Sequence, residues 1–346
     1  MSKVYFKKVE HNSNPKTVSK ISQELLDKVI TEEDISLEKE IPLKVHFGEK
    51  GNVTFIGAEN FDGIIDYLQQ KNIKTSFMES SVLYGGQRFK RELHLNTAKE
   101  HGFTRLPVII ADGELGEDFV EVEINKNHFK KCKIGREFSK YNQFVVISHF
   151  KGHMLAGFGG AIKQLSMGFA SKGGKLAMHM GTKPHIINKR CRKCNLCKQR
   201  CNENAITISE KSFIDHNKCV GCGACVSICP YKAATIISLK SVLRMFGFGN
   251  PFKEKLVEYA YAAQKGKKNI YINFAISIAC GCDCEPKKLK ILIDDIGILA
   301  STDPVAIDKA CYDLAKYKGK KFKGFDTFKY AEKIGLGSSN YNLIEV

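Results

Sequence analysis

Two stretches dominate this 346-residue sequence: CRKCNLCKQRC at residues 191–201 and CVGCGACVSIC at residues 219–229. Each has the cysteine spacing C-x2-C-x2-C-x3-C, and Pro230 follows the second. The x2 spacings let three thiolates of one tight loop converge on a single iron–sulfur cube, while the fourth comes from a helix start further on. We therefore expect the two runs to fold together.

This spacing is the ligand run of bacterial two-cluster ferredoxins, in which the fourth cysteine of each run binds the other cluster. The expected cofactors are two 4Fe–4S clusters. The expected ligands of the first cluster are Cys191, Cys194, Cys197 and Cys229. The expected ligands of the second cluster are Cys219, Cys222, Cys225 and Cys201.

The alternatives for these cysteines are two zinc sites or a disulfide framework. Zinc ribbons use CxxC pairs and have no need of a third and fourth cysteine in the same run. Disulfides need an oxidising compartment, and MSKVYFKKVEHN at the start has no apolar stretch of a signal peptide behind it. Because no apolar run approaches the roughly 18 residues of a membrane helix, we expect a cytoplasmic protein with no membrane partner.

The formal net charge of +17 favours acidic partners. We expect an acidic redox partner such as a ferredoxin or flavodoxin, or an anionic small molecule. The lysines are scattered rather than interleaved with aromatic residues, and no helix-turn-helix, RRM or OB signature occurs, so nucleic acid is not expected. A solvated, lysine-rich surface is the alternative explanation of the charge.

Strand-like and helix-like stretches alternate over residues 41–150 and again after residue 239, which predicts an α/β domain with a mostly parallel sheet. Asp303-Pro304 is expected to start a helix. The cysteine-rich segment is then an α+β insertion that divides the chain into residues 1–188, 189–238 and 239–346. Apolar patterns predict strands in IPLKVHFG (41–48), NVTFIGA (52–58), IKTSFMES (73–80) and LPVIIADG (106–113), and a helix in FDGIIDYLQQKN (61–72).

A glycine-rich turn follows the strand-like run near residue 150 and precedes a helix-like segment. Backbone N–H groups at such a helix start can bind an anion, although a tight turn or close packing explains the glycines equally well. Lysines here can anchor negative charge, and a histidine can donate a proton. The candidate binding glycines are Gly157, Gly159 and Gly160, and the candidate catalytic residues are Lys151, His153 and Lys163.

Cys280, Cys282 and Cys284 form a second cysteine pattern, C-x-C-x-C. In an extended stretch all three side chains share one face, which favours a soft-metal site or thiol chemistry. Reduced, buried cysteines are the alternative. Since no apolar residue separates the cysteines, we predict that Cys282 and Cys284 face a pocket of the α/β domain, close to His153 or His46.

Long stretches of the chain resemble a known family, the iron–sulfur branch of the domain-of-unknown-function 362 family. The resemblance covers residues 3–346. It is carried by LKVHFGEKGNVTFI, SSVLYGGQRF, HFKGHMLAGFGGAIKQLSMGFASKGGKL, the eight-cysteine segment, GCDC and DDIGILASTDPVAID. The positions that match the family's motifs are His46, Tyr84, Arg88, Lys151, His153, Lys163, Cys282 and Cys284.

The resemblance implies an α/β domain with a two-cluster ferredoxin module in a redox setting, and no settled reaction. The chain departs from the family pattern near Ala275–Cys280, where Ser277 and Cys280 stand in place of an acidic residue and a proline. The sequence thus predicts an iron–sulfur electron-transfer protein that delivers electrons to an anionic small-molecule site, as an oxidoreductase of unknown substrate. The alternatives are a non-catalytic electron carrier and clusters that only stabilise the fold.

Overall fold

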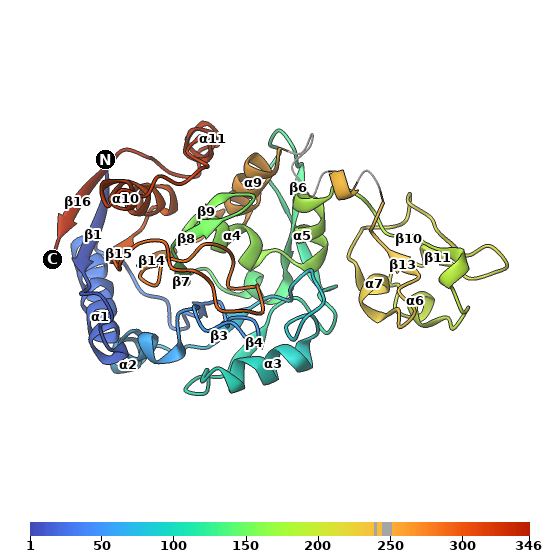
Figure 1. Ribbon diagram of the computed structural model, residues 1–346, viewed down its shortest axis with the longest axis horizontal. Coiled ribbons are helices and arrows are strands. Elements are labelled where there is room, and N and C mark those ends of the chain that lie inside the picture. The colour runs from blue at the N-terminus through green and yellow to red at the C-terminus, as the bar shows by residue number, and fades with distance from the viewer. Residues whose placement is uncertain (239–240, 244–250) are drawn as a thin grey trace.

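An eight-stranded sheet in the order β16-β1-β15-β14-β7-β2-β3-β4 runs through the computed structural model, which describes residues 1–238, 241–243 and 251–346 (Figure 1). All neighbouring strands are parallel except where β15 meets β1 and β14. The expected mostly parallel α/β sheet is therefore confirmed. The strands are β1 (Ser2–Lys8), β2 (Leu43–Lys44), β3 (Phe77–Glu79), β4 (Val108–Ile110), β7 (Val145–His149), β14 (Ile270–Ala275), β15 (Gly297–Ser301) and β16 (Tyr341–Glu345).

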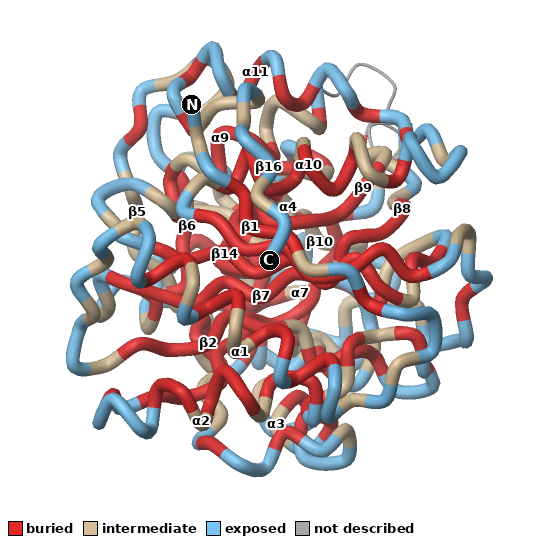
Figure 2. Tube along the Cα trace, turned by 90° about the vertical axis from the view of Figure 1, so that its left-hand side faces the viewer, coloured by how far each residue is buried: buried red, intermediate tan, exposed pale blue. Residues whose placement is uncertain are grey.

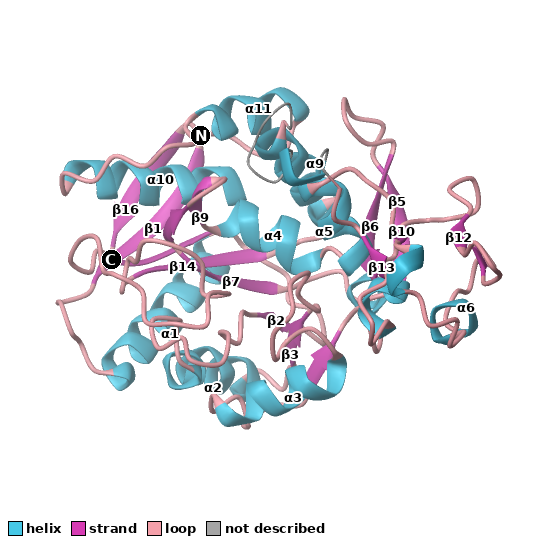
Figure 3. Cartoon of the chain, turned by 45° about the vertical axis from the view of Figure 1, so that its right-hand side comes forward, coloured by secondary structure: helices cyan, strands magenta, loops and turns pink. Residues whose placement is uncertain are grey.

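Helices cover both faces of the sheet (Figure 3). Alternate residues of each strand therefore pack into two separate hydrophobic cores. Val145 and Ile147 of β7 pack with α1 (Pro15–Glu32), α2 (Asp62–Gln70) and α3 (Arg91–Glu100). Val146 packs with the opposite group: α4 (Ala161–Phe169), α9 (Phe252–Gln264), α10 (Pro304–Tyr317) and α11 (Asp326–Ile334). Figure 2 shows the buried strands between the two partly exposed helix layers. No helix in the described residues is long and apolar enough to span a membrane.

Local chemistry explains one correct and one incorrect prediction. Asp303 accepts hydrogen bonds from the backbone N–H of Val305 at 2.8 Å and of Ala306 at 3.1 Å, which confirms the expected start of α10. The strand predicted over residues 52–58 is wrong, because no strand forms there. The Asn52 side chain accepts a hydrogen bond from the Thr54 N–H at 2.8 Å, and such a local bond competes with strand pairing.

Short elements complete the α/β domain. Two antiparallel strand pairs lie outside the main sheet, and 3-10 helices connect some of the longer elements. These elements are η1 (Ala58–Phe61), β5 (Phe119–Glu123), β6 (Lys131–Gly135), η2 (Arg136–Lys140), β8 (Lys151–His153), β9 (Gly157–Gly159) and α5 (Lys172–His179); η3 (Asn188–Arg190) belongs to the cysteine-rich segment that follows.

Residues 185–235, here called the cysteine module, form a smaller unit beside α5 (Figure 1). Its first half contains β10 (His185–Ile186), α6 (Leu196–Gln199) and β11 (Ile206–Thr207). Its second half repeats this order 28 residues later with β12 (Phe213–Ile214), α7 (Ala224–Ile228) and β13 (Ala234–Thr235). Because β10 pairs with β13 and β11 with β12, the two halves interlock. The module's pairing begins before residue 189, and the expected boundary at residue 239 lies outside the described residues.

The helix α5 holds the cysteine module against the α/β domain. The Lys172 ammonium donates a hydrogen bond to the Ser227 hydroxyl of the module at 2.9 Å. A Cβ atom added to Gly173 would lie 2.8 Å from the Gly221 carbonyl oxygen and 3.0 Å from the Cα of Cys222. The loop of the second cysteine run therefore lies directly on the first turn of α5.

Candidate functional site

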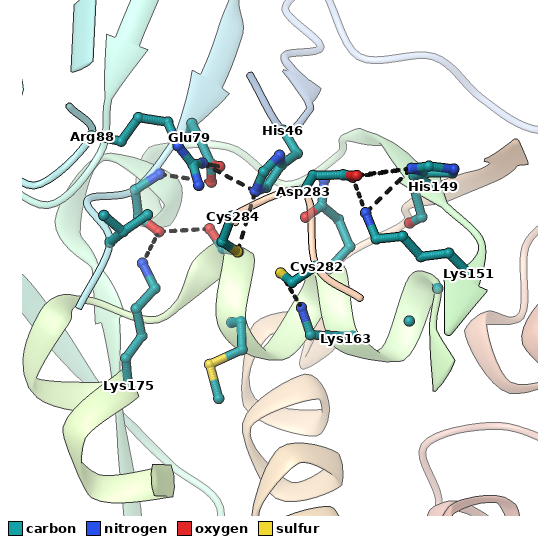
Figure 4. Close-up of a pocket in the computed structure, with 18 residues that line it drawn as sticks. His46, Glu79, Arg88, His149, Lys151, Lys163, Lys175, Cys282, Asp283 and Cys284 are labelled. Carbon is teal, nitrogen blue, oxygen red and sulfur yellow. Dashed lines mark hydrogen bonds and ion pairs between the residues drawn. The ribbon is translucent and has the colours of Figure 1, made fainter. Parts of the chain in front are cut away.

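A cavity of about 600 Å³, including its open mouth, lies at the carboxyl ends of the parallel strands. From β2 the sheet continues through β3 and β4 on one side, and through β7 and β14 on the other. Open α/β sheets bind ligands where the strand order reverses in this way. The ionisable side chains that line the cavity are His46, Glu79, Arg88, His149, Lys151, Lys163, Lys175, Cys282, Asp283 and Cys284 (Figure 4).

The wall formed by β2 and β3 carries a buried charge network. Glu79, at the end of β3, forms ion pairs with Lys44 at 2.8 Å and with Arg88 at 3.3 Å. Burial raises the pKa of Glu79, but the neighbouring cations outweigh burial and hold that pKa below its usual value. Arg88 is fully buried and also donates a hydrogen bond to the Tyr84 hydroxyl at 2.7 Å. Glu79 and Arg88 are thus both charged, and these contacts hold their side chains in place.

The opposite wall, at the end of β7, is organised around Asp283. This carboxylate forms an ion pair with Lys151, and it lies 3.0 Å from Nδ1 of His149. The Nε2 atom of His149 lies 2.9 Å from the Ile276 carbonyl oxygen. Burial raises the pKa of Asp283, whereas Lys151 and His149 reverse that effect and hold it well below its usual value. The loop after β14 is thereby tied to β7.

Two thiols lie between these walls, on the loop after β14. The Sγ of Cys282 lies 3.7 Å from the Lys163 ammonium, and the Sγ of Cys284 lies 3.8 Å from Nε2 of His46. A hydrogen bond from Cys284 holds the pKa of Cys282 well below its usual value; burial opposes this, and Lys163 lowers that pKa further. The same hydrogen bond, followed by burial, raises the pKa of Cys284. These shifts favour the thiolate form at Cys282 and the thiol form at Cys284.

Lys175, on α5, contributes the cation on the side of the cavity nearest the cysteine module. Its ammonium donates hydrogen bonds to the Ser80 hydroxyl at 2.7 Å and to the Ser81 carbonyl oxygen at 2.5 Å. An ammonium has three N–H donors, and the described residues accept hydrogen bonds from two of them. Burial lowers the pKa of Lys175 to about 8.

The predicted residues near β8 and β9 have different surroundings. Lys151, Lys163, Gly159 and Gly160 line the cavity. The position of Cys282 and Cys284 facing the cavity, with Cys284 next to His46, matches the prediction.

His153, the predicted proton donor, is not among the lining residues. Its Nδ1 accepts a hydrogen bond from the Ala156 N–H at 3.1 Å. Burial, followed by the charge of Lys163, lowers the pKa of His153 to about 3. The proton-donor role of His153 stays a prediction.

The glycine turn mainly serves packing. Gly157 has a φ of +90°, and a Cβ atom there would lie 2.1 Å from the Lys323 carbonyl oxygen. The first N–H groups of α4 already bind a carboxylate, because Asp308 accepts hydrogen bonds from Ala161 N at 2.6 Å and Ile162 N at 3.0 Å. The backbone N–H groups of Ala161 and Ile162 are therefore already bonded to Asp308. Anion binding by Gly159 and Gly160 stays a prediction.

Sequence reasoning did not single out several lining residues. Glu79, Lys175 and Asp283 come from three separate parts of the chain, and charged residues are usually on the surface. The one available signal was the position of Asp283, which stands between two cysteines that were themselves candidate site residues.

Two further cavities in the cysteine module are lined by cysteines. Each draws three cysteines from one run and the fourth from the other run, which is the grouping that the crossed ligand pattern predicts. One is lined by Cys191, Cys194, Cys197 and Cys229, here called the outer set. The other is lined by Cys201, Cys219, Cys222 and Cys225, here called the inner set.

The surroundings of both sets fit an iron–sulfur cube. The Ala205 N–H donates to the Sγ of Cys201 at 3.4 Å, and the Ala233 N–H donates to the Sγ of Cys229 at 3.2 Å. Such hydrogen bonds to the sulfurs tune cluster potentials.

Among the residues that the structure describes, no three His, Cys, Asp or Glu side chains converge closely enough to share one metal ion. A cube spreads four thiolates over four irons and does not need that convergence. The soft-metal hypothesis for Cys280, Cys282 and Cys284 gains no support, since Cys280 is exposed and does not line the cavity.

These features define an α/β protein with a cavity at the carboxyl ends of its parallel strands and a cysteine-rich module. Residues 41–313 match the model of the family described as "domain of unknown function (DUF362)". The chain belongs to that family, and its similarity to ferredoxin-like proteins supports the iron–sulfur branch.

Curated relatives match only short stretches. Over 44 residues the chain is 48% identical to a component of the ion-translocating oxidoreductase complex of Methanosarcina acetivorans, covering 12% of this chain and 17% of that protein. Over 51 residues it is 39% identical to the uncharacterised ferredoxin-like protein YdhY of Escherichia coli K12, covering 13% of this chain and 24% of that protein. The chain thus spans less than a quarter of the length of either relative.

Two solved structures are similar over larger shares of the chain. A Thermotoga maritima protein determined as a structural-genomics target has a TM-score of 0.45 at 10% identity, covering 89% of this chain and 60% of that one. The lactate racemase apoprotein of Thermoanaerobacterium thermosaccharolyticum has a TM-score of 0.36 at 14% identity, covering 80% of this chain and 51% of that one.

Proposed function

We propose that this protein is an iron–sulfur electron-transfer protein that delivers electrons to an anionic small molecule in the cavity at the sheet edge. The inner and outer sets each hold one 4Fe–4S cluster, and each cluster supplies one electron at a time when bound. Membership of the DUF362 family and similarity to ferredoxin-like proteins support the redox setting.

The observation that carries this proposal is the position of α5 between the two kinds of site. Lys175 of α5 lines the ligand cavity. Two residues earlier, Gly173 lies against Gly221 and Cys222 of the inner set's loop. About one helix diameter, roughly 10 Å, therefore separates the inner set from the cavity. Electrons tunnel rapidly over such a distance, so the inner set is the immediate donor.

The cavity residues bind and orient the anion. Four cationic side chains, Arg88, Lys151, Lys163 and Lys175, line the cavity together with two carboxylates. Both of those carboxylates, Glu79 and Asp283, are already neutralised by ion pairs. The remaining positive charge attracts a negatively charged ligand, and burial strengthens that attraction by excluding water.

The outer set receives electrons from an acidic partner protein. Cys194 of the outer set is exposed, whereas the inner set lies against α5. The exposed cations within five residues of Cys194, here called the basic rim, are Lys189, Arg190, Arg192, Lys193 and Lys198. A ferredoxin or flavodoxin with an acidic face complements this rim, and such complementarity speeds association.

A non-catalytic carrier, or clusters that only stabilise the fold, would leave the predicted anion-binding residues scattered. Instead, Lys151, Lys163, Cys282 and Cys284 share one cavity that α5 links to the module. This arrangement favours the redox-enzyme interpretation over both alternatives.

Metal analysis of anaerobically purified protein, combined with mass spectrometry of co-purified small molecules, tests the proposal. We expect about eight irons and eight acid-labile sulfides per chain, and a bound anion. Lys163→Met should release the anion while the iron content stays the same. About two zinc ions per chain would contradict the proposal, and intact clusters with no anion bound under any condition would leave only the carrier function.

A further inference from the structure

A tight turn on the cavity wall contains Cys282 as its first residue and Cys284 as its third. The Glu285 N–H donates a hydrogen bond to the Cys282 carbonyl oxygen at 2.9 Å, and the Cys282 N–H donates to the Glu285 carboxylate at 3.1 Å. These bonds fold residues 282–285 into a turn. As the first and third residues of this turn, Cys282 and Cys284 both line the cavity with their side chains.

Each thiol has a partner suited to redox chemistry. Lys163, 3.7 Å from Cys282, stabilises a thiolate, which is the nucleophilic form of cysteine. His46, 3.8 Å from Cys284, can move a proton to or from that sulfur. Figure 4 shows both sulfurs facing the same cavity, with Lys163 and His46 on opposite sides of the pair.

We propose that Cys282 and Cys284 are a redox-active pair that alternates between a dithiol and an intramolecular disulfide, relaying two electrons from the cysteine module to the bound anion. The proposal deepens the function given above and rests on it for the source of the electrons. A dithiol stores two electrons, so it converts single-electron delivery into the two-electron reduction of an organic acceptor.

Both half-reactions balance. The Cys282–Cys284 disulfide takes up two electrons, delivered singly by the module, and one proton; the S–S bond breaks to give the Cys282 thiolate and the Cys284 thiol. The pair then reduces an anionic two-electron acceptor. The acceptor gains the electron pair together with the Cys284 proton, and the S–S bond forms again. Lys163 offsets the thiolate charge, and His46 exchanges the proton on Cys284.

Thiol trapping in the intact, anaerobic holoprotein tests this proposal. Cys280→Ser serves as the background because Cys280 is exposed and outside the cavity. The protein is equilibrated in mixtures of reduced and oxidised dithiothreitol, quenched with N-ethylmaleimide, and digested with trypsin. The peptide of residues 269–287 should carry two labels at low potential and none at high potential, with a single midpoint. Two labels at every ratio would overturn the proposal.

The link to the module needs a second measurement. The oxidised protein receives reduced methyl viologen, and the same peptide is followed over time. Cys201→Ser, which removes one inner-set ligand, should slow disulfide reduction at least tenfold, whereas the background variant should not. Equal rates would overturn the relay. Iron content and cluster absorbance are measured on the same samples. Absence of clusters from the Cys280→Ser background protein, which would refute the proposed function, is thereby distinguished from intact clusters beside an inert cysteine pair.

Discussion

The Lys163 ammonium lies 3.7 Å from the Sγ of Cys282, and the two residues come from a helix and a loop that are 119 residues apart in the chain. A buried cation beside a sulfur favours its thiolate form. Replacing Lys163 by Met should therefore raise the pKa of Cys282. The thiolate exists above this pKa, so the rate of iodoacetamide labelling at Cys282 should rise only at a higher pH than in the parent protein.

Lys288→Met is the matched control, since this lysine is exposed and lies only four residues after Cys284. Both variants are made in the Cys280→Ser background and labelled anaerobically. Coincident pH profiles for the two lysine variants would show that Lys163 does not stabilise the thiolate.

Anion binding in the cavity should weaken as the pH rises through about 8. Burial lowers the pKa of Lys175 to about 8, so this lining cation is charged below that pH and neutral above it. Arg88 and Lys163, whose pKa values are raised, keep their charge. Calorimetry with sulfate, whose own charge is constant, should show an affinity about tenfold lower at pH 9.5 than at pH 7, a change of roughly 1.4 kcal/mol.

Lys175→Met should bind sulfate weakly at both pH values, with no step between them. The exposed Lys99→Met serves as the control and should keep the parent profile. If the sulfate affinity of Lys175→Met still fell by the same factor between pH 7 and pH 9.5, the titrating group would be a residue other than Lys175.

The crossed ligand sets predict which double variants damage one cluster and which damage two. Cys201→Ser combined with Cys222→Ser removes two ligands of the inner set, so about four irons per chain should remain. Cys201→Ser combined with Cys194→Ser removes one ligand from each set, and little iron should remain. An uncrossed pattern gives the reverse order of iron contents, so anaerobic iron analysis of the two variants decides the matter.

The contact between α5 and the inner-set loop should not tolerate a single added carbon. Gly173→Ala places a Cβ atom 2.8 Å from the Gly221 carbonyl oxygen. Neither atom can rotate away, because the Cβ is fixed to the backbone and the oxygen is part of it, so α5 and the inner-set loop must separate slightly. Overpacking of this kind costs about 1 to 3 kcal/mol, even though alanine is the better helix former. Cluster absorbance should be lost at a temperature at least about 2 °C lower. Gly85→Ala, which meets no atom within 4 Å, should behave as the parent does.

Reversing charge on the basic rim should slow electron uptake from an acidic donor. Arg192→Glu with Lys193→Glu should lower the rate of reduction by reduced flavodoxin about tenfold at low salt, and the deficit should shrink at high salt. Lys16→Glu with Lys20→Glu makes the same change in net charge on α1, at the opposite end of the molecule (Figure 1). If both variants slow reduction equally, net charge rather than the rim guides the donor.

Features encoded in short sequence spacings could be predicted well. The cysteine runs predicted the two four-cysteine sets that line the module's cavities, and Asp303-Pro304 predicted the start of α10. Each depends on residues that are close in the chain or on a repeat, so the local pattern holds the needed information. The short stretch 52–58 failed for a related reason: a single side-chain hydrogen bond from Thr54 to Asn52 outweighs its apolar pattern.

Long-range pairings left no such pattern. Asp308 lies on α10 but accepts hydrogen bonds from the first amides of α4, nearly 150 residues earlier. Glu79 is an acid buried in the core region only because Lys44 and Arg88 neutralise it. Neither residue stands out by periodicity or spacing. The cavity's charge pattern therefore depends on the strand order, which sets the contacts and which a single sequence does not reveal.

The strand order also affects how the chain matures on the ribosome. β1 is the first strand to be synthesised, yet both of its neighbours in the sheet, β15 and β16, follow the cysteine module in the chain. At about 5 to 20 residues per second, several seconds pass between the completion of the module and the synthesis of β15. By the end of that interval all eight cysteines have left the ribosome, while the sheet still lacks β15 and β16. Insertion of the proposed clusters can therefore precede closure of the domain, and β1 stays unpaired and exposed to aggregation until β15 is synthesised.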